Sequence, residues 1–276
     1  MTSLAAPLPV AAIQMIAGPD VAENLAAVRR LTRAAAAGGA KLVALPENAA
    51  IMGKNERDKI AVREVDGVGP IQESLAAIAR ESDVWLVAGT IPMAATDPGK
   101  VRAACLVFDP SGRRVARYDK IHLFGFEQGV ERYAEANTIE PGATPCAVDT
   151  AAFGPSIGRL GLTICYDVRF PELYRALGPC DMMFVPSAFT ATTGRAHWET
   201  LIRARAIENQ CYVLAPAQGG VHANGRETHG HTMIVDPWGA VLAMQARGEG
   251  VVHALVDPAV IARVRTSLPA LTHRVM

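Results

Sequence analysis

The sequence predicts an α/β protein whose β-sheet is mixed. Residues 10–15 and 41–45 are short apolar stretches typical of buried strands, and a helix that begins at Asp20 separates them. A strand, a helix and a strand in this order form a βαβ unit, in which the two strands are parallel. Farther along, Asp109-Pro110-Ser111-Gly112 is a hairpin turn, and the strands on either side of it are antiparallel.

The other elements are predicted in chain order. Asp20 is the expected N-cap of the first helix because Glu23 follows three residues later, and Gly38-Gly39 ends that helix. Further strands are expected at 84–90, 101–108, 113–118, 146–150, 157–164, 181–187, 211–217, 233–236, 241–244 and 251–256. Further helices are expected at 70–82, from 171 to about 178, at 197–209 and from 257 to about 265. Residues 124–142 form a long connection, which we expect to fold over a site.

The length of 276 residues fits one large domain or two small ones, and the absence of a repeat, a low-complexity stretch or a linker favours a single domain that spans residues 1–276. Half of the residues are hydrophobic and the mean hydropathy is +0.17, so a large core is available. No apolar run is long enough to span a membrane, and the N-terminus lacks the pattern of a signal peptide. Lys plus Arg and Asp plus Glu balance at 27 each. We therefore expect a soluble cytoplasmic protein that binds neither nucleic acid nor a membrane.

The five cysteines differ in their surroundings. Their odd number and the absence of an export signal argue against a disulfide framework. Cys105 and Cys211 lie in apolar runs and are expected to be small buried hydrophobes. Cys165 ends a strand and precedes a helix whose first turn contains Pro171. Because backbone N–H groups and a helix dipole lower the pKa of a thiol, Cys165 is the expected nucleophile.

Two ionisable residues occupy the same kind of position as Cys165. Glu47 follows the apolar strand at 41–45, and Lys120 follows the strand at 113–118. Catalytic groups of α/β sheets collect at such strand ends, so a carboxylate there could serve as a general base and an ammonium could stabilise an oxyanion. Taken alone, each residue also fits an ordinary role on the surface.

Three motifs together resemble the nitrilase (carbon–nitrogen hydrolase) superfamily. They are Leu-Pro-Glu-Asn at 45–48, Tyr-Asp-Lys-Ile-His-Leu at 118–123 and Cys-Tyr-Asp-Val-Arg-Phe-Pro-Glu-Leu at 165–173, in the family's order. The resemblance implies a four-layer α-β-β-α sandwich of two mixed β-sheets. It also implies a small-molecule amide substrate, no cofactor, and homodimers or higher homo-oligomers formed through the helices at 170–177 and 197–209.

The resemblance assigns a role to each site residue. Glu47 would be the general base, and Cys165 would attack the amide carbonyl to give a thioester. Lys120 and the backbone N–H of Tyr166 would bind the oxyanion. Glu135, in Tyr-Ala-Glu-Ala-Asn-Thr at 133–138, would orient Lys120 and the substrate amide. The loop departs from the family pattern, because Phe-Gly-Phe stands at 124–126 where many relatives have an acidic residue.

Later motifs resemble the Nit branch of small-amide hydrolases. These are Ser-Ala-Phe-Thr at 187–190, Thr-Gly-Arg-Ala-His-Trp-Glu at 193–199 and Arg-Ala-Arg-Ala-Ile-Glu-Asn-Gln at 203–210. Within this branch, the motifs at 217–222, 229–233 and 235–239 and the ending at 268–274 are closest to amidases of deaminated glutathione. Omega-amidases, which act on 2-oxoglutaramate and 2-oxosuccinamate, are the alternative, and a non-catalytic interaction scaffold with the same fold is an alternative of another class.

Two further features leave alternatives open. Arg169 could grip the carboxylate of an oxo-acid substrate, or it could form a structural ion pair with Glu172 or Asp167. His229 and His231 form a His-Gly-His pair with no evident third ligand, so we expect them to be structural and expect no metal site.

Overall fold

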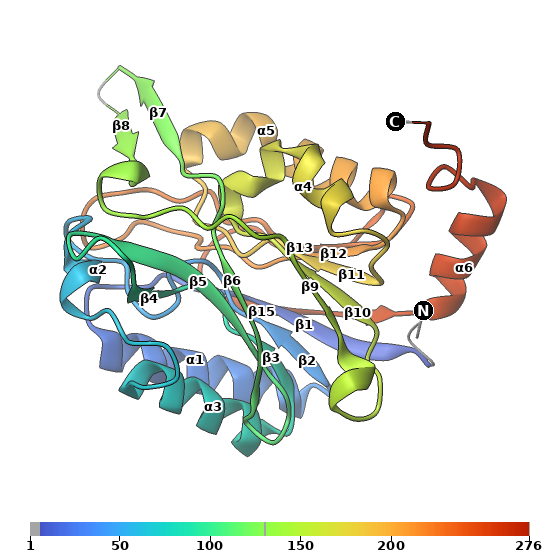
Figure 1. The fold of residues 1–276 in the computed structure, drawn as a ribbon, viewed down its shortest axis with the longest axis horizontal. Helices are drawn as coiled ribbons and strands as arrows, with labels where there is room; N and C mark the ends of the chain where they lie inside the picture. The colour runs from blue at the N-terminus through green and yellow to red at the C-terminus, as the bar shows by residue number, and fades with distance from the viewer. Residues whose placement is uncertain (1–5, 130, 276) are drawn as a thin grey trace.

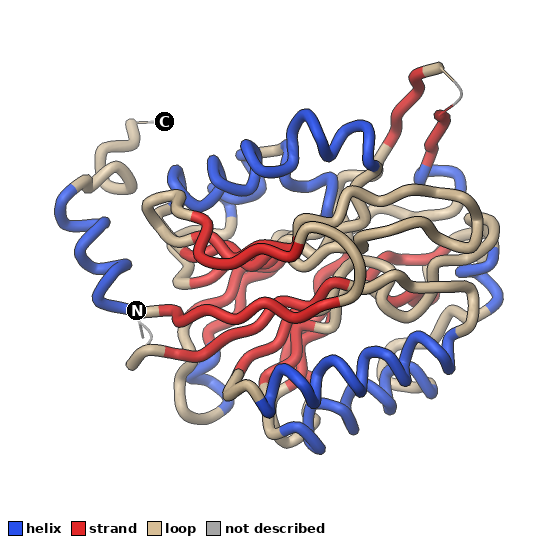
Figure 2. The backbone as a smooth tube through the Cα atoms, turned by 180° about the vertical axis from the view of Figure 1, so that it is seen from behind, coloured by secondary structure: helices blue, strands red, loops and turns tan. Residues whose placement is uncertain are grey.

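The computed structural model describes residues 6–129 and 131–275, which form two large β-sheets packed face to face between layers of helices (Figure 1). Figure 2 shows the same layers from behind, with helices on the outer faces of both sheets. The four-layer α-β-β-α arrangement of mixed sheets is therefore confirmed.

The first sheet contains, within the described residues, seven strands in the order β15-β1-β2-β3-β5-β4, with β6 paired to β5. The strands β1 and β2 are parallel, as the predicted βαβ unit requires, whereas β5 and β6 are antiparallel. The bounds are β1 Leu8–Gln14, β2 Leu42–Ala44, β3 Trp85–Val87, β4 Ile91–Ala94, β5 Val101–Phe108, β6 Arg114–Asp119 and β15 Gly250–Val256.

The second sheet has, in the part of the chain that the structure describes, the order β14-β13-β12-β11-β10-β9. Its central strands β10, β11 and β12 are parallel, and the outer pairs are antiparallel. The bounds are β9 Cys146–Asp149, β10 Arg159–Leu162, β11 Met182–Phe184, β12 Tyr212–Ala215, β13 Thr232–Val235 and β14 Val241–Gln245.

The helices cover the outer faces of both sheets. The helices α1 and α3 pack on the first sheet, α4 and α5 pack on the second, and α6 lies at the end of the sandwich near the two termini (Figure 1). The bounds are α1 Val21–Ala37, α2 Asp58–Ala61, α3 Pro70–Ser82, α4 Pro171–Ala176, α5 Ala191–Asn209 and α6 Pro258–Ser267, with 3₁₀ helices at Glu135–Asn137, Thr150–Phe153 and Cys165–Arg169. No helix among residues 6–129 and 131–275 has the length and apolar character needed to cross a membrane.

The alternation of each strand divides the apolar side chains between two cores. In β1, Val10 faces the space between the sheets with Leu160 of β10, whereas Ile13 faces α1 and α3. The helix boundaries follow local chemistry as well. The Asp20 carboxylate accepts a hydrogen bond from the Glu23 N–H, and this cap confirms the predicted start of α1.

Four elements differ from the prediction. The strand β4 was not predicted, because it follows β3 after a short turn at Gly89 and appeared continuous with it. The long connection contains a hairpin, β7 (Gly125–Gln128) and β8 (Glu131–Ala134), which stands out from the body of the protein (Figures 1 and 2). The helix α5 begins at Ala191 rather than at His197, because Thr190 caps it through the Thr193 N–H.

Candidate active site

Lys120 lies at the centre of a buried charged cluster. Its Nζ is 2.8 Å from Glu47 Oε1, and 3.0 and 2.8 Å from the two carboxylate oxygens of Glu135. The Lys120 side chain is fully buried, and 4% of the Glu47 side chain and 15% of the Glu135 side chain are exposed. The structure thus brings together three of the four residues predicted to be catalytic. Two of them, Glu47 and Glu135, are 88 residues apart in the sequence.

Glu47 is fixed by contacts from the second sheet. Its Oε2 accepts a hydrogen bond of 2.8 Å from the Ala188 N–H, and its backbone carbonyl accepts one of 2.9 Å from Gln218 Nε2. Both partners follow strands of the second sheet, β11 and β12. The first sheet therefore supplies the carboxylate, and the second sheet determines how it points.

Cys165 lies on a sharp turn where β10 gives way to the 3₁₀ helix. Its φ is +49°, in the left-handed region that residues other than glycine rarely adopt. The Cys165 N–H donates to the Pro186 carbonyl at 2.9 Å, which ties the turn to the end of β11. Strained backbone of this kind is common at functional sites, where the surrounding structure holds a side chain in one orientation.

The electrostatics of the cluster keep Cys165 in its thiol form. Burial, then the negative charge of Glu47, raises the pKa of Cys165 well above its ordinary value, although Lys120 opposes the change. The expected lowering of this pKa by a helix is therefore wrong. The segment after Cys165 is only a short 3₁₀ helix, and two carboxylates lie nearby.

Lys120 and Glu135 remain charged. Burial alone would lower the pKa of Lys120, but the carboxylates of Glu135 and Glu47 raise it well above its ordinary value. Burial alone would raise the pKa of Glu135, but Lys120 holds it below its ordinary value. With one ammonium and two carboxylates the cluster has a net charge of −1. Moving a proton from the Cys165 thiol to Glu47 leaves that net charge unchanged.

Glu135 is positioned by the base of the hairpin. Its Oε2 accepts a hydrogen bond of 2.7 Å from the Phe124 N–H, and the Glu135 N–H donates to the Phe124 carbonyl at 3.0 Å. The atypical Phe-Gly-Phe segment therefore holds the second glutamate through backbone groups, which any residue except proline at position 124 could supply.

The Tyr166 N–H has no hydrogen-bond partner within the described chain. It follows Cys165 directly, so it points from the same turn that carries the thiol. An unpaired backbone donor beside a nucleophile can bind a developing oxyanion. The Tyr166 N–H is thus available for the oxyanion role, which stays a prediction.

Asp167 was not predicted to serve the site, yet it joins the Lys120 strand to the Cys165 turn. Its Oδ2 accepts from the Tyr118 hydroxyl at 2.7 Å and from the Ile164 N–H at 2.9 Å. Its Oδ1 lies 3.0 Å from the His122 N and 2.7 Å from His122 Nδ1. Tyr118 and His122, two residues before and after Lys120, thus bind one fully buried carboxylate. A Tyr and a His at this spacing around Lys120 are the sequence pattern that could have predicted such a carboxylate.

Arg169 forms no ion pair with Glu172 or Asp167 in the described chain. Its guanidinium lies 5.6 Å from the ring centroid of Tyr166 and 5.4 Å from that of Phe189, and its Nη1 is 3.3 Å from His197 Nδ1. The structural ion pair considered from the sequence is therefore absent among these residues. Arg169 stacks behind two aromatic side chains that border the Cys165 chamber.

The chamber beside Cys165 opens toward a larger groove. Its other lining residues are Phe124, Glu135, Tyr166, Ala188, Phe189, Thr190, Thr193 and Arg226. The chamber volume is about 10 Å³, so a substrate enters only if some of these side chains move apart. Phe124, Glu135 and Arg226 also line the neighbouring groove of about 920 Å³, so the two spaces adjoin at these side chains.

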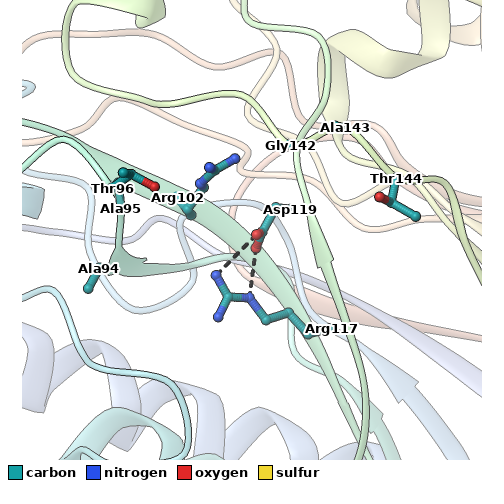
Figure 3. A pocket seen from close by; sticks show the side chains of 9 residues that line it. All are labelled: Ala94, Ala95, Thr96, Arg102, Arg117, Asp119, Gly142, Ala143 and Thr144. Atoms are coloured by element: carbon teal, nitrogen blue, oxygen red, sulfur yellow. Dashed lines mark hydrogen bonds and ion pairs between the residues drawn. The ribbon is translucent and has the colours of Figure 1, made fainter.

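Another hollow, of about 590 Å³, lies away from the thiol (Figure 3). Its two arginines are neutralised: Arg117 pairs with Asp119, as the dashed lines show, and Arg102 pairs with Glu140. It lacks the nucleophile and the general base, so we assign it no catalytic role.

His229 and His231 stack with ring centroids 4.3 Å apart. Among the described residues no group of three or more His, Cys, Asp or Glu side chains is arranged to hold a metal ion. The five cysteines are all free.

Similarity to known proteins extends over nearly the whole chain. Residues 9–266 match the family model described as carbon-nitrogen hydrolase. A deaminated glutathione amidase from Synechocystis sp. is 42% identical, with 98% of each chain covered. The human deaminated glutathione amidase is 37% identical, with 99% of this chain and 84% of that protein covered. The crystal structure of Saccharomyces cerevisiae Nit3, described as a member of branch 10 of the nitrilase superfamily, superposes with a TM-score of 0.89 at 29% identity, covering 100% of this chain and 99% of that one.

Proposed function

The chain belongs to the carbon–nitrogen hydrolase family, and from this premise we propose that it is an amidase that hydrolyses deaminated glutathione through a thioester on Cys165. The observation that carries the proposal is the Lys120 ammonium held between the carboxylates of Glu47 and Glu135 beside a buried thiol. A nucleophile, a base and an oxyanion partner are together what acyl transfer requires.

The first half of the reaction makes the thioester. Glu47 takes the proton from Cys165 Sγ as the sulfur attacks the amide carbonyl carbon. The carbonyl oxygen becomes an oxyanion, which the Tyr166 N–H and the Lys120 ammonium stabilise, one of the two Glu135 contacts of Lys120 giving way to it. The C–N bond then breaks, and the amine leaves with the proton that Glu47 had taken.

The second half hydrolyses the thioester. A water molecule enters where the amine has left, and Glu47 removes its proton as the oxygen attacks the thioester carbonyl. The C–S bond breaks and Cys165 regains its proton, which leaves a free carboxylic acid and the starting enzyme. Glu135 stays ionised throughout, because the Lys120 ammonium holds the pKa of its carboxyl group below the ordinary value.

Replacement of the nucleophile tests the proposal. Cys165→Ala is expected to abolish the release of 2-oxoglutarate from deaminated glutathione while the circular dichroism spectrum stays that of the wild type. Undiminished turnover would contradict the mechanism. A wild-type protein that hydrolyses no 2-oxo-acid amide would favour the interaction scaffold instead.

The omega-amidase alternative is tested on the same enzyme. We expect kcat/KM to be higher for deaminated glutathione than for 2-oxoglutaramate, since the relatives matched over nearly the whole chain are named for the former. Equal or reversed preference would overturn the choice of substrate and leave the thioester chemistry intact.

We extend the proposal to assembly and location. A homodimer through α4 and α5 would give a mass of twice 29.2 kDa in light scattering, and a mass of 29.2 kDa would contradict it. We expect the protein to be cytoplasmic and to bind neither nucleic acid nor a membrane. Amidase activity should therefore be found in the cytoplasmic fraction of the cell. That residues 1–276 form a single domain stays a prediction, for which one cooperative unfolding transition is the test.

A further inference from the structure

The groove next to the Cys165 chamber is much larger than an ammonia leaving group needs. It has a volume of about 920 Å³, and it meets the chamber at Phe124, Glu135 and Arg226. Glu135 and Arg226 line both spaces, so a substrate amide held beside Cys165 has the groove on one of its sides. The groove is therefore a space into which the larger part of a bound substrate can extend.

The groove carries an excess of positive charge. In the described chain Arg57, Lys100 and Arg226 line it without an ion pair to a carboxylate. Each of its two lining carboxylates has a cationic partner: Glu56 pairs with Lys59, and Glu135 pairs with Lys120, which it shares with Glu47. An anionic group entering the groove would thus meet unpaired cations.

Arg226 stands at the junction with an unused donor. Its guanidinium lies 5.0 Å from the ring centroid of Tyr133 in the hairpin, and its Nη2 donates to the Ala188 carbonyl at 2.6 Å. Its Nε is buried and has no partner. Because a buried donor without a partner is costly, this N–H is a place where a polar group of the substrate would be stabilised.

We propose that this groove binds the amine half of the substrate, with Arg226 where the groove adjoins the chamber and with Arg57 and Lys100, which line the groove but not the chamber, holding a carboxylate. The proposal rests on the proposed function and sharpens it. In deaminated glutathione the scissile amide joins a 2-oxoglutaryl group to cysteinylglycine, a dipeptide that ends in a carboxylate. Two extended residues span up to about 7 Å, so the carboxylate lies well outside the narrow chamber.

The experiment uses three amides that share the 2-oxoglutaryl group and differ only in the leaving amine: cysteinylglycine, cysteinylglycine amide and ammonia. Each is assayed with the wild type, Arg57→Gln, Lys100→Gln, the double variant and the control Lys54→Gln. Lys54 is exposed and does not line the groove. The measured quantity is the ratio of kcat/KM for the cysteinylglycine substrate to kcat/KM for each of the other two. A general loss of activity cancels in this ratio.

We expect the wild-type ratios to exceed one. Each single variant should lower them about fivefold, as for one exposed ion pair. The double variant should lower them further, without the two effects simply multiplying, because both cations contact the same carboxylate. Lys54→Gln should leave them unchanged. Ratios near one in the wild type, or equal ratios in the wild type and the double variant, would overturn the groove proposal while the amidase assignment stands. Wild-type enzyme inert on all three amides would overturn the proposed function, and the groove proposal with it.

Discussion

The Tyr118 hydroxyl donates a hydrogen bond of 2.7 Å to Asp167, between the strand that carries Lys120 and the turn that carries Cys165. Both side chains are buried. Since the two segments belong to different sheets, this contact and those of His122 with the same carboxylate connect the ammonium to the nucleophile. Asp167 is thus a positioning residue, which acts through others rather than on the substrate.

Replacing Asp167 with Asn should lower kcat by about tenfold or more with little change in KM, because small displacements of reacting groups are costly. An amide cannot accept on both sides, so donors such as the Ile164 N–H would lose their acceptor. The free energy of unfolding should fall by about 1–3 kcal/mol. Steady-state kinetics and urea unfolding check both effects.

Tyr118→Phe is the milder comparison, because it removes a single hydrogen bond and should lower the free energy of unfolding by only about 1 kcal/mol. An Asp167→Asn enzyme with wild-type kcat would show that the carboxylate is only structural.

Backbone strain at Cys165 predicts that two inactive variants differ in stability. The φ of +49° is unfavourable for any residue with a Cβ, by about 1–2 kcal/mol, and glycine is free of this cost. Cys165→Gly should therefore be more stable than Cys165→Ala by about 1 kcal/mol, as measured by urea unfolding. A stability order of Ala above Gly would mean that the turn is relaxed rather than strained.

Glu47→Gln should make Cys165 easier to alkylate while it abolishes turnover. Burial and then the charge of Glu47 raise the pKa of this thiol, so removing the charge lowers that pKa. The pH at which iodoacetamide modifies the Cys165 peptide at half its maximal rate should move downward. Loss of a general base should reduce kcat about 10²–10⁴-fold. Cys146, the most exposed of the five cysteines, serves as the internal control in the same digest. If the pH dependence of alkylation were unchanged or shifted upward, the charge of Glu47 would not be a cause of the raised pKa of Cys165.

The sequence was enough to predict where the strands end and which residues form the site. It was not enough to predict the contacts between the two sheets that orient these residues. Glu47, Lys120 and Cys165 each follow an apolar run, a local pattern. The Ala188 N–H that orients Glu47 lies 141 residues away, and no local pattern encodes such a pairing. The direction of the pKa shift at Cys165 was wrong for a related reason. Burial and the charges of Glu47 and Glu135 act through space, whereas the sequence displayed only the neighbouring helix start.

His229 should make the fold sensitive to mild acid. Burial, then the charges of His231, Arg195 and Arg247, lowers the pKa of His229 from 6.5 to about 4. Above pH 6.5 it is neutral whether the chain is folded or unfolded. Below pH 6.5 the unfolded chain binds the proton more readily, so stability falls as the pH drops toward 4. His229→Gln should reduce the difference in unfolding free energy between pH 7 and pH 5, whereas the exposed His253→Gln should not. If the two variants showed the same difference in unfolding free energy between pH 7 and pH 5, His229 would not be the cause of the acid sensitivity.

Arg169 gives the sharpest test of how the acyl half of the substrate is recognised. It has no carboxylate partner among the described residues, and it stacks on Tyr166 and Phe189 at the border of the chamber. We therefore expect it to bind the 2-oxo-acid carboxylate, since a charged hydrogen bond contributes about 1.5–3 kcal/mol. Arg169→Gln should raise KM for 2-oxoglutaramate about tenfold or more, with a smaller change in kcat. Arg195→Gln, on an exposed position of α5, is the matched control. If Arg169→Gln instead lowers kcat and KM is unchanged, the guanidinium shapes the nucleophile turn rather than the substrate site.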